Sequence, residues 1–591
     1  MDDTPTQINL LTLNVWGLKY ISKLRRQRLE EIGRQLAAAD PQPHIVALQE
    51  CFTEEDYRSI RRETRFMLPY GKYYCSGSFG GGLAILSRWP IEESTVFRYS
   101  LNGRPTAFFR GDWYVGKGVA CAKIRYGPGP KHIVEVFNTH THSPYESGPN
   151  DSYLCHRTSQ AWEMAKLLRG AAERGHLVVA LGDFNMLPLS LQHRIITAHS
   201  PVRDVWRVLH PESSVGPADH PAEQARRRPI PTAEFNIIEN GAASDGPYNT
   251  WRWTKQQQKL LGPGKPEVTV APDTIDRRGK RIDFVFASTG DISVLGGGWA
   301  PTRASVGMMM RHPQLGCSLS DHFAVEATLE FHPLSAPSSS SDNPQPHHLH
   351  PAKTTATATA TPYDTGALKP RGPSKQSSLL SNPKFRPDSE TIAHDVFLRA
   401  PAGATPGGGG TEDDGETFDA RTMSTHIPAQ ALDNGTFLHI APQRSPTPSE
   451  AGFGSHDHLD DDLSQKKEFA AQANLGDEQT ALPGTVYDDV LAVLERYVRR
   501  EEGQRKWRGR HFFASVAGTV ACLVGVFWSP HNYVAFILML VSSLGLVAGT
   551  IDGLLALLFF NSELRALREF EWEVRNAKGG RDDMDDDQRA W

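Results

Sequence analysis

The chain has 591 residues, a mass of 65.4 kDa and a net charge of −5, with 63 Lys and Arg against 68 Asp and Glu. This length exceeds one small module and allows several domains. The charge balance argues against a general nucleic-acid binder, whose surface would carry an excess of Lys and Arg, so we expect no nucleic-acid partner.

The cysteines and the first residues bear on the cellular compartment. Six cysteines are spread along the chain without a CxxC pair, which is too few and too scattered for a disulfide framework. The start, MDDTPTQINL, lacks the basic and apolar segments of a secretory signal. These features favour a reducing compartment and predict no cleaved signal.

Residues 1–332 are expected to form a catalytic domain of the α/β class. Between short apolar runs, Ser159 to Arg169 has apolar residues at helical spacing, with Ala161, Met164, Ala165 and Leu168 on one face. Such alternation predicts covered sheets packed with helices. The runs expected to be strands are INLLTLNVW, HIVALQE, GGLAILS, VEVFNTH, LVVALGDFN, RIDFVFAS and HFAVEATLE.

Residues 333–484 are expected to form a disordered linker. The segment is rich in Pro, Ser, Thr and Gly, with stretches such as SAPSSSSDNPQPHH and PAGATPGGGG. It contains none of the twelve Trp residues, of which eight precede residue 300 and four follow residue 506. Such a composition buries too little apolar surface to offset the entropy of ordering the chain.

The remaining residues predict a membrane anchor. Phe512 to Trp528 and Tyr533 to Ile551 are uncharged stretches, each ~26 to 29 Å long as a helix, which matches the ~30 Å hydrocarbon core of a bilayer. We expect a transmembrane helical hairpin over 512–560 and a charged tail over 561–591. The alternative is a buried helical hairpin of a soluble domain.

Residues 485–511 are expected to form an amphipathic, basic juxtamembrane helix that lies on the membrane or on a partner. Its basic residues precede the first span, so the positive-inside rule places the catalytic domain and the tail in the cytoplasm. The same residues could attract anionic phospholipid. The endoplasmic reticulum and the mitochondrion both remain open as the membrane.

Polar residues that carry chemistry stand where the expected apolar strands end. Amide and carboxylate oxygens gathered there would form a site for a hard cation, with titratable groups beside it. Each residue alone is more often structural, and the indication comes from the whole ordered set. The set is Asn14, Glu50, His140, Asp183, Asn185, Asp321 and His322.

The motifs around these residues resemble the DNase I-like endonuclease/exonuclease/phosphatase superfamily and, within it, the neutral sphingomyelinases. GDFN (Gly182 to Asn185) is typical of the superfamily, and the following Met186 and Pro188 resemble a sphingomyelinase-like extension. The layout with linker and two spans is similar to that of the fungal inositol phosphosphingolipid phospholipases C. The resemblance implies a four-layer α/β sandwich. Further matching motifs are THTHSPY, HRTSQAWEMAKLL, GLAILSRWPI and RIDFVF.

The resemblance also implies a role for each site residue. Glu50 and Asn14 would hold Mg²⁺, and Asp321 could join a second cation. His322 would be the general base, with its tautomer held by Asp283. Asp183 would orient water or assist the base, and Asn185 would donate to a phosphoryl oxygen. His140 would steady the phosphate or protonate the leaving alkoxide, although His142, two residues on, could exchange roles with it.

The segment Gly111 to Val119 (GDWYVGKGV) carries Asp112 and Lys117 and resembles a P-loop-like element of the eukaryotic relatives. It lacks the GxxxxGK[ST] pattern of a nucleotide-binding loop. The resemblance implies that Asp112 and Lys117 take part in lipid-dependent activation. The alternative is an exposed ion pair of little energetic weight.

These observations predict a Mg²⁺-dependent phospholipase C that converts membrane sphingolipids to ceramide and a phosphorylated headgroup. A nuclease or an inositol-polyphosphate phosphatase on the same fold is the alternative enzyme, because a fold alone does not choose the substrate. A catalytically inactive membrane scaffold would have lost site residues, and all seven are present. Phosphoinositol and phosphocholine both remain open as headgroups, since the pocket is expected in the segment from Val202 to Trp253.

Overall fold

The computed structural model of the protein describes residues 4–146, 151–334 and 484–589. The predicted disordered linker, residues 333–484, lies almost entirely outside the described residues. The described parts before and after it belong to one compact unit.

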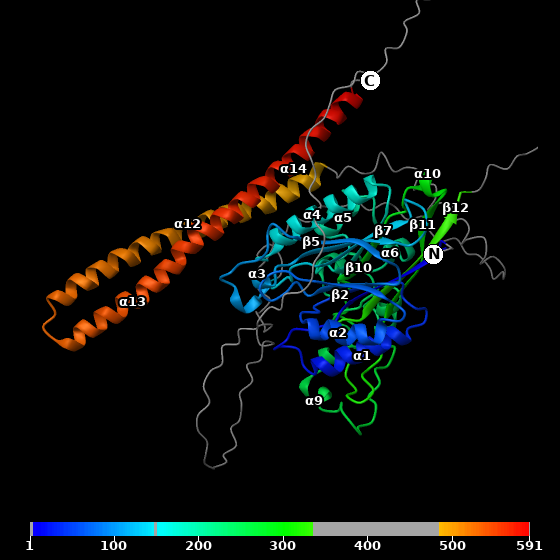
Figure 1. The fold of residues 1–591 in the computed structure, drawn as a ribbon, viewed down its shortest axis with the longest axis horizontal. Coiled ribbons are helices and arrows are strands. Elements are labelled where there is room, and N and C mark those ends of the chain that lie inside the picture. The colour runs from blue at the N-terminus through cyan, green and yellow to red at the C-terminus, as the bar shows by residue number, and fades with distance from the viewer. Residues whose placement is uncertain (1–3, 147–150, 335–483, 590–591) are drawn as a thin grey trace, which may run out of the picture. The chain divides into compact units, whose positions relative to one another are not determined.

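Two six-stranded sheets form the centre of the catalytic fold, with strand orders β11-β12-β1-β2-β4-β3 and β5-β6-β7-β8-β10-β9 (Figure 1). The first sheet comprises β1 (Gln7–Asn14), β2 (Ile45–Gln49), β3 (Tyr70–Tyr74), β4 (Leu83–Ser87), β11 (Gly297–Gly307) and β12 (Ala324–Pro333). The second comprises β5 (Ile91–Arg98), β6 (Gly118–Arg125), β7 (Ile133–His140), β8 (Leu177–Asp183), β9 (Arg203–Asp204) and β10 (Asp283–Ala287).

The sheets pack face to face because their central strands are apolar on both sides. Every residue of β2, β7 and β8 is buried. Their inward side chains meet in one cluster, which includes Leu10 and Ala47 of the first sheet and Val136, Leu181 and Val285 of the second. Strands covered on both faces read as continuous apolar runs, which is the pattern seen in the sequence.

Helices cover the outer faces and complete four layers, as predicted. Helices α1 (Arg25–Ala38) and α2 (Glu54–Thr64) lie outside the first sheet, whereas α4 (Leu154–Glu173) and α5 (Leu191–Ala198) lie outside the second (Figure 1). The helix expected around residues 159–169 is part of α4. Its predicted apolar face is correct, because Ala161, Met164, Ala165 and Leu168 are all buried.

The strand pairing brings the polar strand ends to one edge of the sandwich. Parallel β1 and β2 pair Asn14 with Gln49, so Glu50 follows directly. Parallel β7 and β8 pair His140 with Asp183. Antiparallel β8 and β10 pair Asp183 with Asp283, which places the first residue of β10 beside the last residue of β8.

Short helices lie in the segments between strands. Arg281, two residues before β10, donates from its buried guanidinium to both oxygens of Asp204 in β9, at 3.0 and 2.9 Å. The short helices are α3 (Asp112–Val115), α6 (Val205–Leu209), α7 (Pro221–Ala225), α8 (Ala233–Ile238), α9 (Lys255–Gln258) and α10 (Ile292–Leu295), with 3-10 turns at Phe108–Arg110 and Thr250–Arg252.

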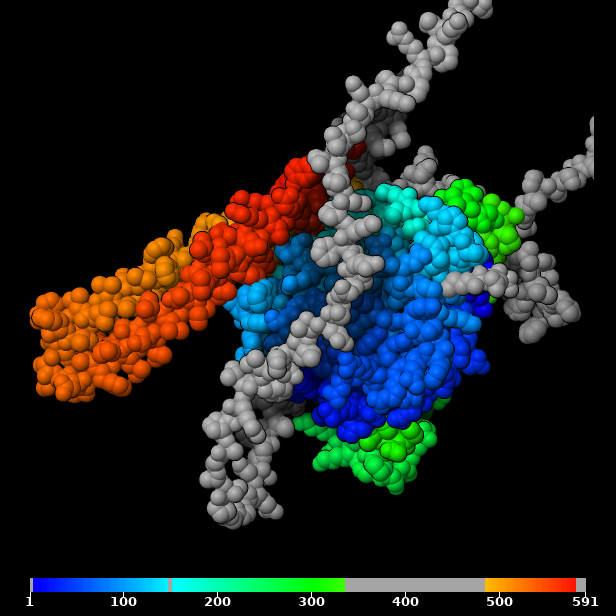
Figure 2. Space-filling view, viewed as in Figure 1, coloured from blue at the N-terminus to red at the C-terminus, as the bar shows by residue number. Residues whose placement is uncertain are grey.

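The C-terminal region is a hairpin of long helices, as predicted. Helix α12 (Gly484–Phe527) and helix α13 (Asn532–Leu554) contain both predicted apolar stretches, and each is long and apolar enough to cross a membrane. Figure 2 shows these stretches, in orange, uncovered over most of their length. A π-helical segment (Leu555–Phe559) then leads into α14 (Phe560–Arg589), so the expected charged tail is helical.

The amphipathic segment expected over residues 485–511 is the first part of helix α12. Residues 485–511 are continuous with the first apolar stretch in one 44-residue helix. Val490 and Leu494 of α12 and Leu567 of α14 are buried in the same apolar cluster as Trp162 of α4. The apolar face of this amphipathic segment therefore packs on the catalytic fold, and its burial does not require a membrane surface.

Candidate active site

Asn14 and Glu50, from neighbouring strand ends of the first sheet, begin the site. The side-chain amide Nδ2 of Asn14 donates to Glu50 Oε1 at 3.0 Å and to Asp183 Oδ2 at 3.1 Å. Its Oδ1 accepts from the backbone N–H of Trp16. Asn14 therefore positions two carboxylates, and its expected role as a cation ligand stays a prediction.

Glu50 sits in a strained backbone conformation. Its φ of 56° lies in the left-handed region, which a side chain disfavours. Such strain persists only where the surrounding structure imposes it, and it is concentrated at functional sites. Asn185, with φ of 45°, shares this feature.

His140 and Asp183, from adjacent strands of the second sheet, face these residues. His140 Nε2 lies 3.6 Å from Asp183 Oδ2 and 4.0 Å from Glu50 Oε1. Asp183 Oδ2 is thus shared by Asn14 and His140. The two sheets contribute to one polar cluster at the same edge of the sandwich.

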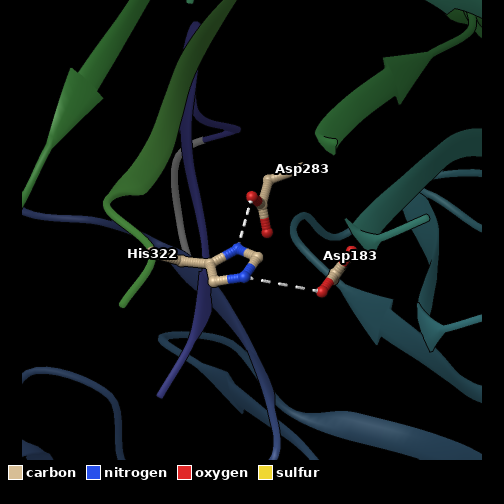
Figure 3. Close-up of side chains that lie close together, drawn as sticks. All are labelled: Asp183, Asp283 and His322. Atoms are coloured by element: carbon tan, nitrogen blue, oxygen red, sulfur yellow. Dashed lines mark hydrogen bonds and ion pairs between the residues drawn. The ribbon is translucent and has the colours of Figure 1, made fainter. Parts of the chain in front are cut away.

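His322 lies between two aspartates, as Figure 3 shows. Its Nδ1 is 2.8 Å from Asp283 Oδ2, and its Nε2 is 4.0 Å from Asp183 Oδ2. The Asp283 contact favours, in the neutral ring, the tautomer with its proton on Nδ1, and it is this neutral form whose Nε2 can accept a proton. This pairing is the one predicted from the sequence.

Burial and crowding of like charges dominate the electrostatics. Burial, together with the charge of Asp321, raises the pKa of Glu50 to about 7. Burial, with the charge of Asp183, raises the pKa of Asp283 to about 6. Burial lowers the pKa of His322, but Asp283 and its neighbouring carboxylates outweigh that effect and raise this pKa well above the ordinary value.

His140 is shifted in the opposite direction. Burial, reinforced by the positive charge of Lys117, lowers the pKa of His140 well below its usual range. The ring is therefore neutral near pH 7. Of the two roles expected for His140, this state favours hydrogen bonding to a phosphate over protonation of a leaving group.

The residues fit a hard cation. Ligand atoms of Asp183, Asp283 and His322 lie within 4.8 Å of one another, a grouping that could hold a metal ion. The second carboxylate oxygen of Glu50, Oε2, is buried and has no hydrogen-bond partner among the described residues. A bound cation would relieve that uncompensated oxygen and the crowding of carboxylates. Asp321, which is only partly buried, is outside this grouping.

Asn185 is connected to the P-loop-like element through one backbone carbonyl. Asn185 Nδ2 and Lys117 Nζ both donate to the oxygen of Thr141, at 3.2 and 2.8 Å. Lys117 Nζ also lies 3.6 Å from Asp112 Oδ1. Both charged residues are only 4% exposed, so the alternative of an exposed ion pair is wrong.

His142 lies apart from the carboxylates. Strand β7 ends at His140, so the alternation that would have placed both histidines on one face stops there. The Nδ1 atom of His142 is 2.6 Å from the amide of Gln160, and its ring contacts those of Tyr153 and His156. His140, rather than His142, is in the polar cluster.

Sequence reasoning missed Arg28 and Thr141. The buried guanidinium of Arg28 donates to the carbonyl oxygens of Val15, Trp16 and Leu319, which joins the end of β1 to the loop that carries His322. In the sequence Arg28 is one of several basic residues at the start of a helix, and nothing marks it. Thr141 acts through its backbone, which residue type does not reveal.

Comparison with known proteins identifies the family of the chain. Residues 11–322, more than half of the chain, match the model of the Endonuclease/Exonuclease/phosphatase family. The chain belongs to that family. It is an enzyme of the phosphoric diester hydrolase class.

The similar proteins include two from fungi. The chain is 41% identical over 325 residues to "Inositol phosphosphingolipids phospholipase C" of Schizosaccharomyces pombe, covering 55% of this chain and 69% of that protein. It is 32% identical over 346 residues to the protein of the same name from Saccharomyces cerevisiae, covering 55% of this chain and 64% of that protein. A solved sphingomyelinase C from Streptomyces griseocarneus aligns with 19% identity and a TM-score of 0.33, over 55% of this chain and 99% of that one.

Proposed function

We propose that the protein is a Mg²⁺-dependent phospholipase C that hydrolyses sphingolipid phosphodiesters to ceramide and a phosphorylated headgroup. The substrates would be inositol phosphosphingolipids, sphingomyelin or both. The observation that carries the proposal is the pairing of His322 with Asp283 beside the buried carboxylates of Glu50 and Asp183. The similar fungal proteins, which are named for hydrolysis of inositol phosphosphingolipids, support this substrate class.

His322 would act as the general base. Its Nε2 would take a proton from water as the water oxygen forms a bond to phosphorus, and the bond from phosphorus to the ceramide oxygen would break as that oxygen takes a proton from solvent. Asp283 would hold the ring and stabilise the imidazolium that results. Asp183, 4.0 Å from Nε2, would orient the water.

Two further residues would bind the phosphate. Neutral His140 would donate a hydrogen bond to a phosphoryl oxygen, and Asn185 would donate another. Donors fixed in place before the reaction stabilise charge that develops on the phosphate without the cost of reorganising solvent. The left-handed backbone of Asn185 and its bond to Thr141 support such fixed placement.

Glu50 would be the principal ligand of Mg²⁺, with Asp183 beside it and Asp321 available to a second ion. The cation would neutralise the crowded carboxylates and the anionic oxygens of the phosphodiester. The buried, unpartnered Oε2 of Glu50 supports this assignment. Asn14 would position Glu50 and Asp183 through its two hydrogen bonds.

The apolar stretches of α12 and α13 would anchor the enzyme in the membrane of its substrate. We place the catalytic domain, residues 1–332, on the cytoplasmic side of the endoplasmic reticulum or mitochondrial membrane, because basic residues precede the first span. The same residues would bind anionic phospholipid. The divisions at 333–484, 485–511, 512–560 and 561–591 remain predictions.

Headgroup release by the purified full-length protein in detergent tests the proposal. Inositol-phosphoceramide, sphingomyelin, single-stranded DNA and a soluble inositol polyphosphate should be compared, each with Mg²⁺ and with a chelator. We expect release of a phosphorylated headgroup from at least one sphingolipid, lost with the chelator and in His322→Ala, and no cleavage of DNA. Cleavage of DNA or of soluble inositol phosphates alone would replace the proposal with the alternative enzyme.

A further inference from the structure

A cluster of exposed aromatic side chains surrounds helix α3. Phe109 is fully exposed, Phe108 and Phe79 are 55% and 53% exposed, and Trp113 is 40% exposed. We call these four residues, with Tyr114 at their centre, the aromatic cluster. Exposed apolar residues are common singly, but a group of large rings in one place marks an interaction surface.

The cluster is held in shape by the fold. Tyr114 contacts the rings of Phe79, Phe108 and Trp113 at centroid distances of 5.4, 5.1 and 5.0 Å. The Tyr114 hydroxyl donates to the carbonyl of Pro105. The backbone N–H of Phe79 donates to the carbonyl of Tyr114 at 3.0 Å, which fastens the two segments together. The rings are thus presented outward by a braced scaffold.

The same loop is attached to the membrane-spanning helix. Arg104 Nε donates to the Tyr497 hydroxyl of α12 at 3.2 Å, and Arg104 Nη2 lies 3.5 Å from Glu501 Oε1. All three residues are buried. About 11 residues separate Glu501 from Phe512, where the apolar stretch begins, which is ~17 Å along a helix. Phe108 and Phe109 follow Arg104 by only four and five residues, in a tight turn in which the Ala107 N–H donates to the Arg104 carbonyl, so the cluster stays close to the point where the loop meets α12.

The cluster also adjoins the candidate active site. Asp112 lies in the same short helix, and its partner Lys117 donates to the Thr141 carbonyl that Asn185 also uses. Tyr145 donates to the other oxygen of Asp112 at 3.0 Å. A displacement of the loop would therefore reach Asn185 through two hydrogen bonds.

We propose that the aromatic cluster inserts into the interfacial region of the bilayer that α12 and α13 span, and so presents the active site to membrane lipid. The inference rests on the proposed function. Aromatic rings are favoured at the level of lipid headgroups, where one side of the ring is apolar and the other is wet. The attachment of Arg104 to α12 favours a bilayer over a second copy of the chain, because the spanning helix brings the bilayer to this loop.

A fluorescent label gives a direct test that does not depend on activity. The chain has two cysteines that are not buried, Cys75 and Cys522, and both would be replaced by Ser. Phe109→Cys then carries a polarity-sensitive dye in full-length protein reconstituted in phosphatidylcholine and phosphatidylserine vesicles. Phe66→Cys is the matched control, because Phe66 is also highly exposed, at 84%. It follows α2, which covers the first sheet, whereas α4 and α12 lie on the side of the second sheet.

We expect brominated acyl chains to quench the dye at residue 109 strongly and the dye at residue 66 little. Equal quenching at both positions, or none at residue 109, would overturn the proposal. If residue 109 is instead covered by a second copy of the chain, the brominated lipids will not quench its dye, and the proposal is wrong.

Hydrolysis measurements give the functional test. The double variant Phe108→Ser, Phe109→Ser changes only exposed side chains and should fold. We expect about a tenfold loss of activity on long-chain substrate in vesicles, because both rings contribute to interfacial binding, and a change within about twofold on a monomeric short-chain substrate. Phe66→Ser should change neither rate.

Unchanged activity on vesicles, or an equal loss on both substrates, would overturn the proposal. If the unmodified protein hydrolyses no sphingolipid at all, the proposed function fails. The quenching experiment still decides whether the aromatic cluster enters the bilayer.

Discussion

Lys117 and Asn185 donate to the same acceptor, the carbonyl oxygen of Thr141, at 2.8 and 3.2 Å. One backbone atom thus joins the P-loop-like element to a residue proposed to bind the phosphate. Lys117 is buried with Asp112, so its ammonium group stays beside that carboxylate and water cannot take its place as the partner.

Lys117→Met should lower kcat more than it changes KM. The variant loses the donor to Thr141 and leaves Asp112 buried without its cation, so the Thr141 carbonyl that Asn185 contacts is less firmly placed. A displacement of about 1 Å at a reacting site can cost about a hundredfold in rate. Steady-state kinetics measure the effect, with Lys123→Met as a control, since Lys123 forms a more exposed pair with Glu93. An unchanged kcat would refute the link.

Glu50→Gln should abolish Mg²⁺-dependent turnover and the stabilisation of the protein by Mg²⁺. Thermal unfolding with and without the cation measures this, because a ligand that binds only the folded state raises Tm. A Mg²⁺-induced rise in Tm equal to that of the unmodified protein would move the ligand assignment away from Glu50.

The same substitution should also stabilise the metal-free protein at alkaline pH. Burial raises the pKa of Glu50 to about 7, so the folded state binds its proton more tightly than the unfolded state. The penalty for the buried charge develops as pH rises from about 4.5 to 7 and is complete above that range. The difference in Tm between Glu50→Gln and the unmodified protein should therefore be larger at pH 8 than at pH 5.

Asp283→Asn should lower turnover by about 10²–10⁴-fold and shift the acidic limb of the kcat/KM profile to lower pH. The charge of Asp283 raises the pKa of His322, so its removal lets the ring stay neutral at lower pH. A pH–rate profile measures both effects. A limb that stays in place would mean that His322 is not the titrating base.

Leu494→Ala should destabilise the catalytic fold by about 2 to 5 kcal/mol, as for other buried leucines. Leu494 of α12 is buried in the apolar cluster that α12 shares with α4 and α14, and the substitution leaves a cavity there. Chemical or thermal unfolding of the full-length protein measures the loss. Glu495→Ala is the control, because Glu495 is mostly exposed and its pair with Arg499 is on the surface. Equal stability of the two variants would mean that α12 does not contribute to this core.

Local sequence was sufficient for the class of fold and for most of the candidate site. Glu50, His140 and Asp183 follow apolar runs, and parallel strands bring their ends to one edge. The RIDFVF motif likewise identified Asp283 as the partner of His322. These predictions succeeded because short, contiguous residue patterns indicate which strands are buried and where they end.

Other features depend on contacts between residues far apart in the chain. Residue type favoured Asn14 as a cation ligand, and the fold adds that its amide holds Glu50 and Asp183. Equal spacing left His140 and His142 exchangeable, whereas the end of β7 separates their surroundings. Which group an amide or imidazole contacts is set by the neighbours that packing supplies.

Apolar runs, polar strand ends and two uncharged stretches were enough to predict two covered sheets, a polar site at their edge and two apolar helices. That the first turns of α12 pack on α4, and that Arg104 contacts Tyr497 and Glu501, is visible only in the folded chain. An amphipathic pattern predicts that one face of a helix is buried, but it does not identify the residues that cover that face. Almost 400 residues separate Arg104 from its partners in α12, and only the folded chain brings such residues together.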